Sequence, residues 1–195
     1  MKYTQIRCLE NIMMPLEGEN PHNSLLKLQY PISNEKRIFI RIENPLKEFH
    51  KNLTNLIDEP ISKIIKNLSS ILGYGCGSTP ESDDIFLGIL ATIYCLNPQI
   101  GKEFEFLSQI PFEKLTTNQS ARLCRRFLKQ NFPSDLITFL KLLKTPLYDD
   151  QVKIRFEHEI RKIRRIGTSS GYYFLMGVLW ELKYATDHIS LSIKK

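Results

Sequence analysis

The sequence has no continuous apolar stretch long enough to cross a bilayer and no secretory signal at its beginning. Its longest apolar stretch runs from Ile85 to Leu96, whereas a membrane-spanning helix needs about 20 residues. Met1 to Glu10 mixes polar and apolar side chains and contains no apolar core of a signal peptide. We therefore expect a cytoplasmic protein that has no membrane partner.

Cysteine and histidine are few and scattered. The four cysteines include no Cys-x-x-Cys pair, and the four histidines are isolated from one another. A zinc site normally needs clustered ligands of these types. The sequence therefore predicts free thiols, no metal site built from these residues, no disulfide framework and no cofactor. The residues are Cys8, Cys76, Cys95, Cys124, His22, His50, His158 and His188.

Signatures of nucleotide and nucleic-acid binding are also missing. No Gly-Lys-Ser/Thr follows the glycines of residues 73–77, and the segment before them has a helical pattern rather than that of a strand. The net charge is +6, and six basic residues lie between Gln151 and Arg165. No helix-turn-helix, zinc-finger or RNP signature accompanies this charge. The sequence therefore favours a small anionic metabolite over nucleic acid as the partner.

The beginning of the chain has the pattern of a small β element. In Arg37 to Glu43 every second residue is isoleucine, which is the period of a half-buried strand. Leu25 to Tyr30 is a second short run, and Pro31 to Asn34 between them has turn chemistry. We therefore predict a β-hairpin within a β-rich element over residues 1–45.

The rest of the chain shows helical periodicity. Asp83 to Leu96 is apolar on nearly every side, which indicates a central helix. Thr117 and Ser134 are expected N-caps. The overall prediction is an α+β fold, predominantly helical, with about six helices over residues 46–195 and one compact domain in all. The clearest helical segments are Ile61–Leu68, Asp83–Leu96, Thr117–Gln130, Ser134–Leu143, Gln151–Arg165 and Ser170 to about Thr186.

Two Gly/Ser-rich loops lead into apolar helices, at residues 73–88 and 167–177. In both, a threonine lies nine residues before a glycine: Thr79 before Gly88, and Thr168 before Gly177. The free N–H groups at a helix N-terminus, together with the helix dipole, favour a bound anion. The two loops are therefore predicted to form the two halves of one binding site.

The side chains of these loops define the candidate site. Asp83 and Asp84 are the candidate catalytic residues, since a carboxylate can hold an ammonium or carbamoyl N–H group or ligate a hard cation. The alternative is that both aspartates only satisfy helix-end N–H groups and that the glycines serve packing. The candidate substrate-binding residues are Gly75, Gly77, Ser78, Thr79, Ser82, Thr168, Ser169, Ser170 and Gly171.

Three stretches in this order resemble the AllH-like family, a subunit of oxamate carbamoyltransferase, over about residues 68–182. They begin GYGCGSTPESDD, LTTNQSARLC and IGTSSGYYFL. In the family's first motif, G-x-G-x-G-L-T-P-S-G-D-D-x-L-x-G, this chain departs at Ser78 and at Glu81-Ser82. In its last motif, Tyr173 stands where an aspartate is expected. The residues that match the first motif are Gly73, Gly75, Gly77, Thr79, Pro80, Asp83, Asp84 and Gly88.

The resemblance implies an enzyme subunit that works with other carbamoyltransferase subunits. In the reaction it implies, a carbamoyl group moves between oxamate and phosphate, the two loops hold carboxylate or phosphate oxygens, and Asp83 or Asp84 holds the carbamoyl NH₂. The exchange of an aspartate for Tyr173 favours an alternative, because it replaces a charged acceptor with a bulky ring. That alternative is a non-catalytic binding or scaffolding member of the same family.

Overall fold

The computed structural model describes residues 2–13, 35–54, 61–98 and 104–192. Within these ranges the chain forms eight α-helices and two short 3-10 helices, with no strand. No helix in the described ranges is long and apolar enough to cross a membrane. The elements are α1 Lys2–Met13, α2 Glu35–Thr54, α3 Ile61–Ser69, α4 Glu81–Leu96, η2 Glu105–Gln109, η3 Phe112–Lys114, α6 Asn118–Leu128, α7 Ser134–Lys144, α8 Asp150–Arg164 and α9 Ser170–Ser192.

The predicted β-hairpin, and with it the α+β fold class, is wrong. Residues 37–43 lie inside α2, and residues 2–13 also form a helix; residues 25–30 are outside the described residues. The alternating isoleucines do not share one face, because Ile42 is fully buried whereas Ile40 is 65% exposed. Ile42 instead joins Leu46 and Phe49 in a buried stripe at helical spacing. Helix α2 continues through Pro45, which lies between these residues in the sequence.

The predictions for the later helices are confirmed to within a few residues. α4 ends at Leu96, with Asn97 as its C-cap directly before Pro98, as the residue before a proline requires. Thr117 is the N-cap of α6, since its side chain accepts a hydrogen bond from the Ser120 amide. Ser134 is not an N-cap: it is the first residue of α7, and Pro133 precedes it.

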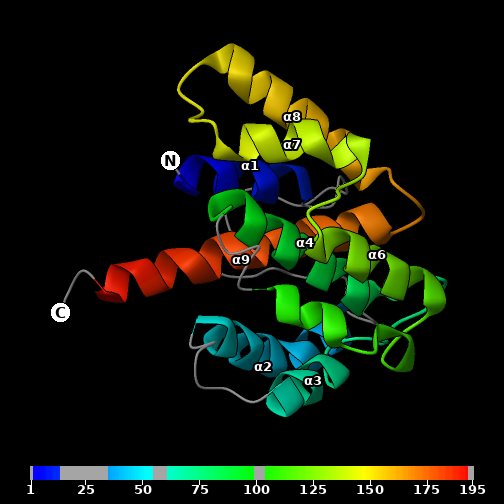
Figure 1. Cartoon of the computed structure of the whole chain (residues 1–195). Helices are drawn as coiled ribbons and strands as arrows, with labels where there is room; N and C mark the ends of the chain where they lie inside the picture. Colours follow the sequence, from blue (N-terminus) through cyan, green and yellow to red (C-terminus); the bar gives the residue numbers. More distant parts are fainter. Residues whose placement is uncertain (1, 14–34, 55–60, 99–103, 193–195) are drawn as a thin grey trace.

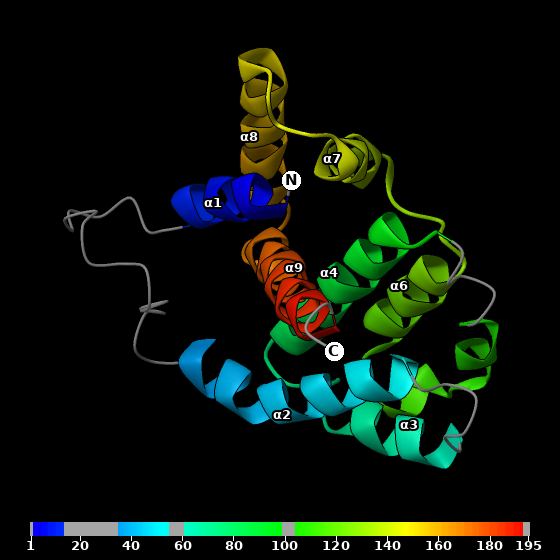
Figure 2. The ribbon, with the colours of Figure 1, turned by 90° about the vertical axis from the view of Figure 1, so that its left-hand side faces the viewer.

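The helices are arranged in layers around α4 and α9, which cross at the centre of the molecule (Figure 1). Helices α1, α7 and α8 lie on one side of this pair, and α2 and α3 lie on the other; α6 runs beside α4 (Figure 2). α4 is buried along nearly its whole length, as its all-round apolar character predicts. The two Gly/Ser-rich loops lead directly into these two central helices.

The crossing of α4 and α9 depends on one glycine from each helix. A Cβ atom on Gly88 would lie 2.0 Å from the Phe174 carbonyl oxygen, and one on Gly177 would lie 2.0 Å from the Ile85 carbonyl oxygen. Each glycine thus faces the residue three positions before the other glycine, so the contact is reciprocal. Both helices also begin seven residues before their glycine, at Glu81 and at Ser170. The two loops are therefore brought to equivalent places at the crossing.

Candidate functional site

The part of the first loop that precedes α4, residues 73–80, is held in shape by side chains from the first turn of α4. Backbone amides of the loop donate hydrogen bonds to these side chains, and the Ser82 amide donates back to the Tyr74 carbonyl at 3.1 Å. Because these amides are already bonded, they are not open to a ligand. The three pairs are Gly73 N to Asp83 Oδ1 at 2.7 Å, Tyr74 N to Ser82 Oγ at 2.9 Å and Cys76 N to Glu81 Oε2 at 2.6 Å.

Asp83 also ties this loop to the segment that leads into α6. Its side chain is fully buried, and its Oδ2 atom accepts a hydrogen bond from the Thr116 hydroxyl. The neighbouring Thr117, besides capping α6, donates its hydroxyl to the Ser78 carbonyl. A buried carboxylate with this many donors serves to hold the backbone in place.

The second loop is a tight return from α8 into α9. Gly167 has φ of 61°, a conformation that side-chain-bearing residues rarely adopt. The Gly171 amide donates to the Ile166 carbonyl at 3.0 Å, and a Cβ atom on Gly171 would lie 1.8 Å from the Ile163 carbonyl oxygen. Glycine at position 171 therefore lets the start of α9 lie directly against the end of α8.

The two loops meet, and a cavity lies between them. The Thr79 and Ser170 hydroxyl oxygens are 3.0 Å apart, which joins residues 91 positions apart in the sequence. The cavity has a volume of about 510 Å³, and it is lined by residues 76–79 and 167–171, by Asp84, and by side chains of α6, α7 and the end of α8. A cavity of this size falls in the range of ligand-binding pockets.

Asp84 is the buried acid of this cavity. Its side chain is only 5% exposed, it lines the cavity, and its Oδ2 atom has no hydrogen-bond partner. Burial raises the pKa of this carboxyl from 3.8 to about 7, and the charges of Asp83 and Glu81 act in the same direction. Hydrogen bonding from Ser170 and Thr79 opposes the rise in pKa. Near neutral pH the group is therefore able to bind or release a proton.

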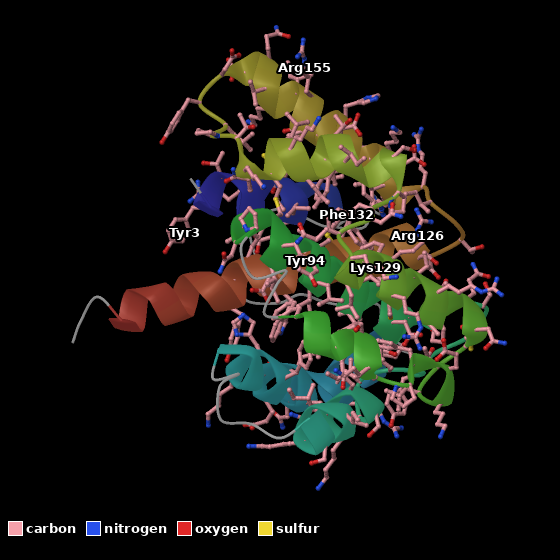
Figure 3. The ribbon with its side chains drawn as sticks, viewed as in Figure 1. Tyr3, Tyr94, Arg126, Lys129, Phe132 and Arg155 are labelled. Carbon is pink, nitrogen blue, oxygen red and sulfur yellow. The ribbon has the colours of Figure 1, made fainter. Side chains whose placement is uncertain are left out.

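Among the described residues, the lining of this cavity includes no lysine, arginine or histidine. Arg125 is engaged with Glu113, at 2.7 Å between Nη2 and Oε2. Arg126 of α6 and its C-cap residue Lys129, both labelled in Figure 3, are exposed. Asp135, the second acid of the lining, lies 3.8 Å from Lys162 and has a side chain that is 60% exposed.

One family model, described as oxamate carbamoyltransferase subunit AllH, matches residues 71–182, which is more than half of the chain. This chain belongs to the AllH family. The matched region contains both loops, the crossing of α4 and α9, and every residue that lines the cavity. Searches of curated proteins and of solved structures return no match.

The structure brings most of the predicted site residues of this AllH-family chain together and separates the rest. The cavity lining does not include Gly75, Ser82 or Asp83. Ser82 and Asp83 are buried, and their side chains accept the hydrogen bonds that shape the first loop. The two adjacent aspartates therefore face different surroundings. The residues that do line it are Gly77, Ser78, Thr79, Asp84, Thr168, Ser169, Ser170 and Gly171.

Sequence reasoning missed the side of the cavity that α6 and α7 supply. Leu123 and Phe127 of α6 and Leu136 of α7 line it, together with Gln119. In the sequence these residues are ordinary members of amphipathic helices, so only the packing of α6 and α7 against α4 shows their place. No signal in a single sequence distinguishes them from other core residues.

Tyr173, which stands where the AllH motif has an aspartate, does not fill the cavity. It is buried on α9 with its ring centroid 5.5 Å from that of Tyr172, and it is not among the lining residues. The exchange therefore leaves the space between the loops open. In the part of the chain that the structure describes, no group of three or more His, Cys, Asp or Glu residues is placed to hold a metal ion.

Because the pKa of Asp84 is raised, we expect the stability of the fold to fall as the pH rises. The folded state holds a proton on Asp84 up to about pH 7, whereas the unfolded chain loses it near pH 3.8, so raising the pH across this range destabilises the fold. Asp84→Asn removes this cost. We expect the variant's advantage in free energy of unfolding to grow by roughly 1.4 kcal/mol per pH unit between pH 4 and 7. Urea unfolding at several pH values measures it, and a pH-independent difference contradicts it.

Proposed function

We propose that this chain acts as a subunit of a carbamoyltransferase, and that its cavity binds oxamate or a related small carboxylate or carbamoyl compound between the loops at residues 73–88 and 167–177. The observation that carries this proposal is Asp84, a buried carboxyl that lines the cavity and has one oxygen without a hydrogen-bond partner. Membership of the AllH family supports the reaction class.

The polar groups around Asp84 suit a carbamoyl or primary amide group. The amide NH₂ donates to Asp84 Oδ2, which fills the position that has no partner in this structure. The hydroxyls of Thr79 and Ser170 hydrogen-bond to Asp84 and to each other in this structure. On ligand binding, one of them turns from Asp84 to donate to the carbonyl oxygen. The oxamate carboxylate then faces the hydroxyls of Ser169 and Thr168. One small compound thus uses both loops at once.

In this transfer the oxamate amide nitrogen forms a bond to the carbamoyl carbon, the bond between that carbon and a phosphate oxygen breaks, phosphate leaves, and the nitrogen gives up a proton. A carboxyl group with a pKa of about 7 is suited to accept that proton at neutral pH. The hydroxyl donors stabilise the negative charge that develops on the carbonyl oxygen, and the loops hold the reacting groups together. Because the lining has no cationic side chain among the described residues, we propose that other subunits bind the phosphate.

The test compares Asp84→Asn with the wild-type chain in the complex assembled with its partner subunits. Asparagine keeps the shape of the side chain but cannot take up a proton, so carbamoyl transfer is expected to fall roughly 100-fold. Circular dichroism checks that the fold is kept. Asp150→Asn, at an exposed position in the first turn of α8, is the matched control and is expected to retain wild-type activity.

Two outcomes count against the proposal. Unchanged transfer by Asp84→Asn removes Asp84 from the reaction. Binding of oxamate by the wild-type chain, without any transfer in the assembled complex, supports instead the non-catalytic binding member that the exchange at Tyr173 favours. Calorimetry with oxamate alone measures the binding, and the transfer assay of the assembled complex distinguishes the two results.

A further inference from the structure

The cavity has two unlike sides. The polar side consists of Ser78, Thr79, Asp84, Thr168, Ser169 and Ser170, all from the two loops or the helix starts that follow them. The apolar part of the lining, called here the apolar side, comes from α4, α6, α7, α8 and α9, and α6 and α7 also supply the polar Gln119 and Asp135. It includes Leu87, Leu123, Phe127, Leu136, Ile163 and Phe174.

The size of the cavity exceeds what a two-carbon acid fills. Its volume is about 510 Å³, whereas pockets of roughly 300–1,000 Å³ hold compounds of drug size. Oxamate is polar throughout, so it leaves the apolar side without a partner. An apolar surface of this kind gains binding free energy only from a ligand that brings apolar atoms to it.

The charges of the cavity further restrict the polar end of the ligand. The two acidic residues that line it are Asp84 and Asp135, and no described cationic side chain lines it. A carboxylate that approaches Asp84 therefore meets another acid in surroundings of low polarity. A neutral amide both donates to a carboxyl oxygen and accepts from a hydroxyl, so it fits the Asp84, Thr79 and Ser170 group better.

We propose that the ligand of this cavity is a primary amide or carbamoyl compound with an apolar substituent. Its amide end lies on Asp84, Thr79 and Ser170, and its substituent lies against the part of the apolar side that α6 and α7 supply. This inference rests on the proposed function, since it concerns the same site, and it extends the substrate class from oxamate to longer, partly apolar amides.

The experiment measures binding of the full chain to a series of primary amides by calorimetry at pH 8. Acetamide, butanamide and hexanamide differ only in chain length, and butanoate and hexanoate are the matched acids. We expect affinity to rise roughly 3- to 4-fold for each added methylene, and each amide to bind more tightly than its acid. A flat series, or acids that bind more tightly than amides, overturns the inference.

A pair of variants places the apolar substituent. Leu123→Gln puts a polar group on the apolar side at a half-buried position of α6, and it is expected to reduce the gain per methylene to less than twofold. Ile137→Gln makes the same kind of change on α7, at a position that is 42% exposed and outside the lining, and is expected to keep the wild-type gain. An equal gain in both variants overturns the placement.

The result for oxamate separates this inference from the proposed function. If the assembled complex transfers a carbamoyl group with oxamate while the amide series stays flat, the inference fails and the proposed function stands. If the amides bind with the expected gain per methylene but Asp84→Asn leaves carbamoyl transfer unchanged, the apolar side is supported and the proposed role of Asp84 fails.

Discussion

Replacing Gly88 with alanine is expected to lower the free energy of unfolding by about 3–5 kcal/mol. The added Cβ atom would lie 2.0 Å from the Phe174 carbonyl oxygen and 3.0 Å from the Val178 amide nitrogen, both of them backbone atoms of α9. Backbone atoms cannot rotate away as a flexible side chain can, so α4 and α9 must move apart. Urea unfolding followed by circular dichroism measures the loss.

Two further variants test whether the crossing is the cause. Gly77→Ala adds the same methyl group at a position with nothing within 4 Å. Because alanine is unfavourable at the positive φ of 88° found there, we expect a loss in the free energy of unfolding, but only of about 1–2 kcal/mol. Gly177→Ala should cost about as much as Gly88→Ala, and the double variant should cost less than the sum, because the helices are already separated. Full additivity of the two changes argues against a single reciprocal contact.

The second large effect is expected at Asp83. Asp83→Ala removes the acceptor for the Gly73 amide and the Thr116 hydroxyl from a fully buried position. We expect a loss of about 3–4 kcal/mol in the free energy of unfolding, since hydrogen bonds to a charged group contribute about 1.5–3 kcal/mol each. Thermal and urea unfolding provide the measurement.

Asparagine at the same position is the control for Asp83. Its amide oxygen still accepts from the Gly73 amide, so Asp83→Asn should cost only about 1–2 kcal/mol. The same change at the neighbouring Asp84 has the opposite sign above pH 7, where it stabilises the fold. Equal effects of the two asparagine variants at pH 8 contradict the division of roles between these residues.

The different surroundings of the two adjacent acids favour Asp84 over Asp83 as the candidate reactive residue. Both carboxyl oxygens of Asp83 accept hydrogen bonds, from the Gly73 amide and from the Thr116 hydroxyl. These bonds hold the first loop against α4 and against the segment before α6. Asp84 faces the cavity, keeps an unpartnered oxygen and has a pKa near 7. A residue whose pKa lies near neutral pH is the better candidate for a part in the proposed reaction.

Sequence alone determined the central and C-terminal helices and the two loops. The periodicity of Asp83 to Leu96 and of Ser170 onward is strong, because these helices are apolar on nearly all sides and have no strand alternative of comparable length. Thr117 is a local signal too, since an N-cap depends only on its own turn. The equal spacing of Thr79 to Gly88 and of Thr168 to Gly177 also pointed to related loops.

Only the tertiary structure decided the rest, because the deciding contacts join distant parts of the chain. Ile38, Ile40 and Ile42 are compatible with a strand by local propensity, and burial against the other helices makes the segment helical. The different roles of Asp83 and Asp84 depend on Thr116 and on Ser170, which lie 33 and 86 residues away. The apolar side of the cavity comes from α6 and α7, whose packing against α4 no local pattern records.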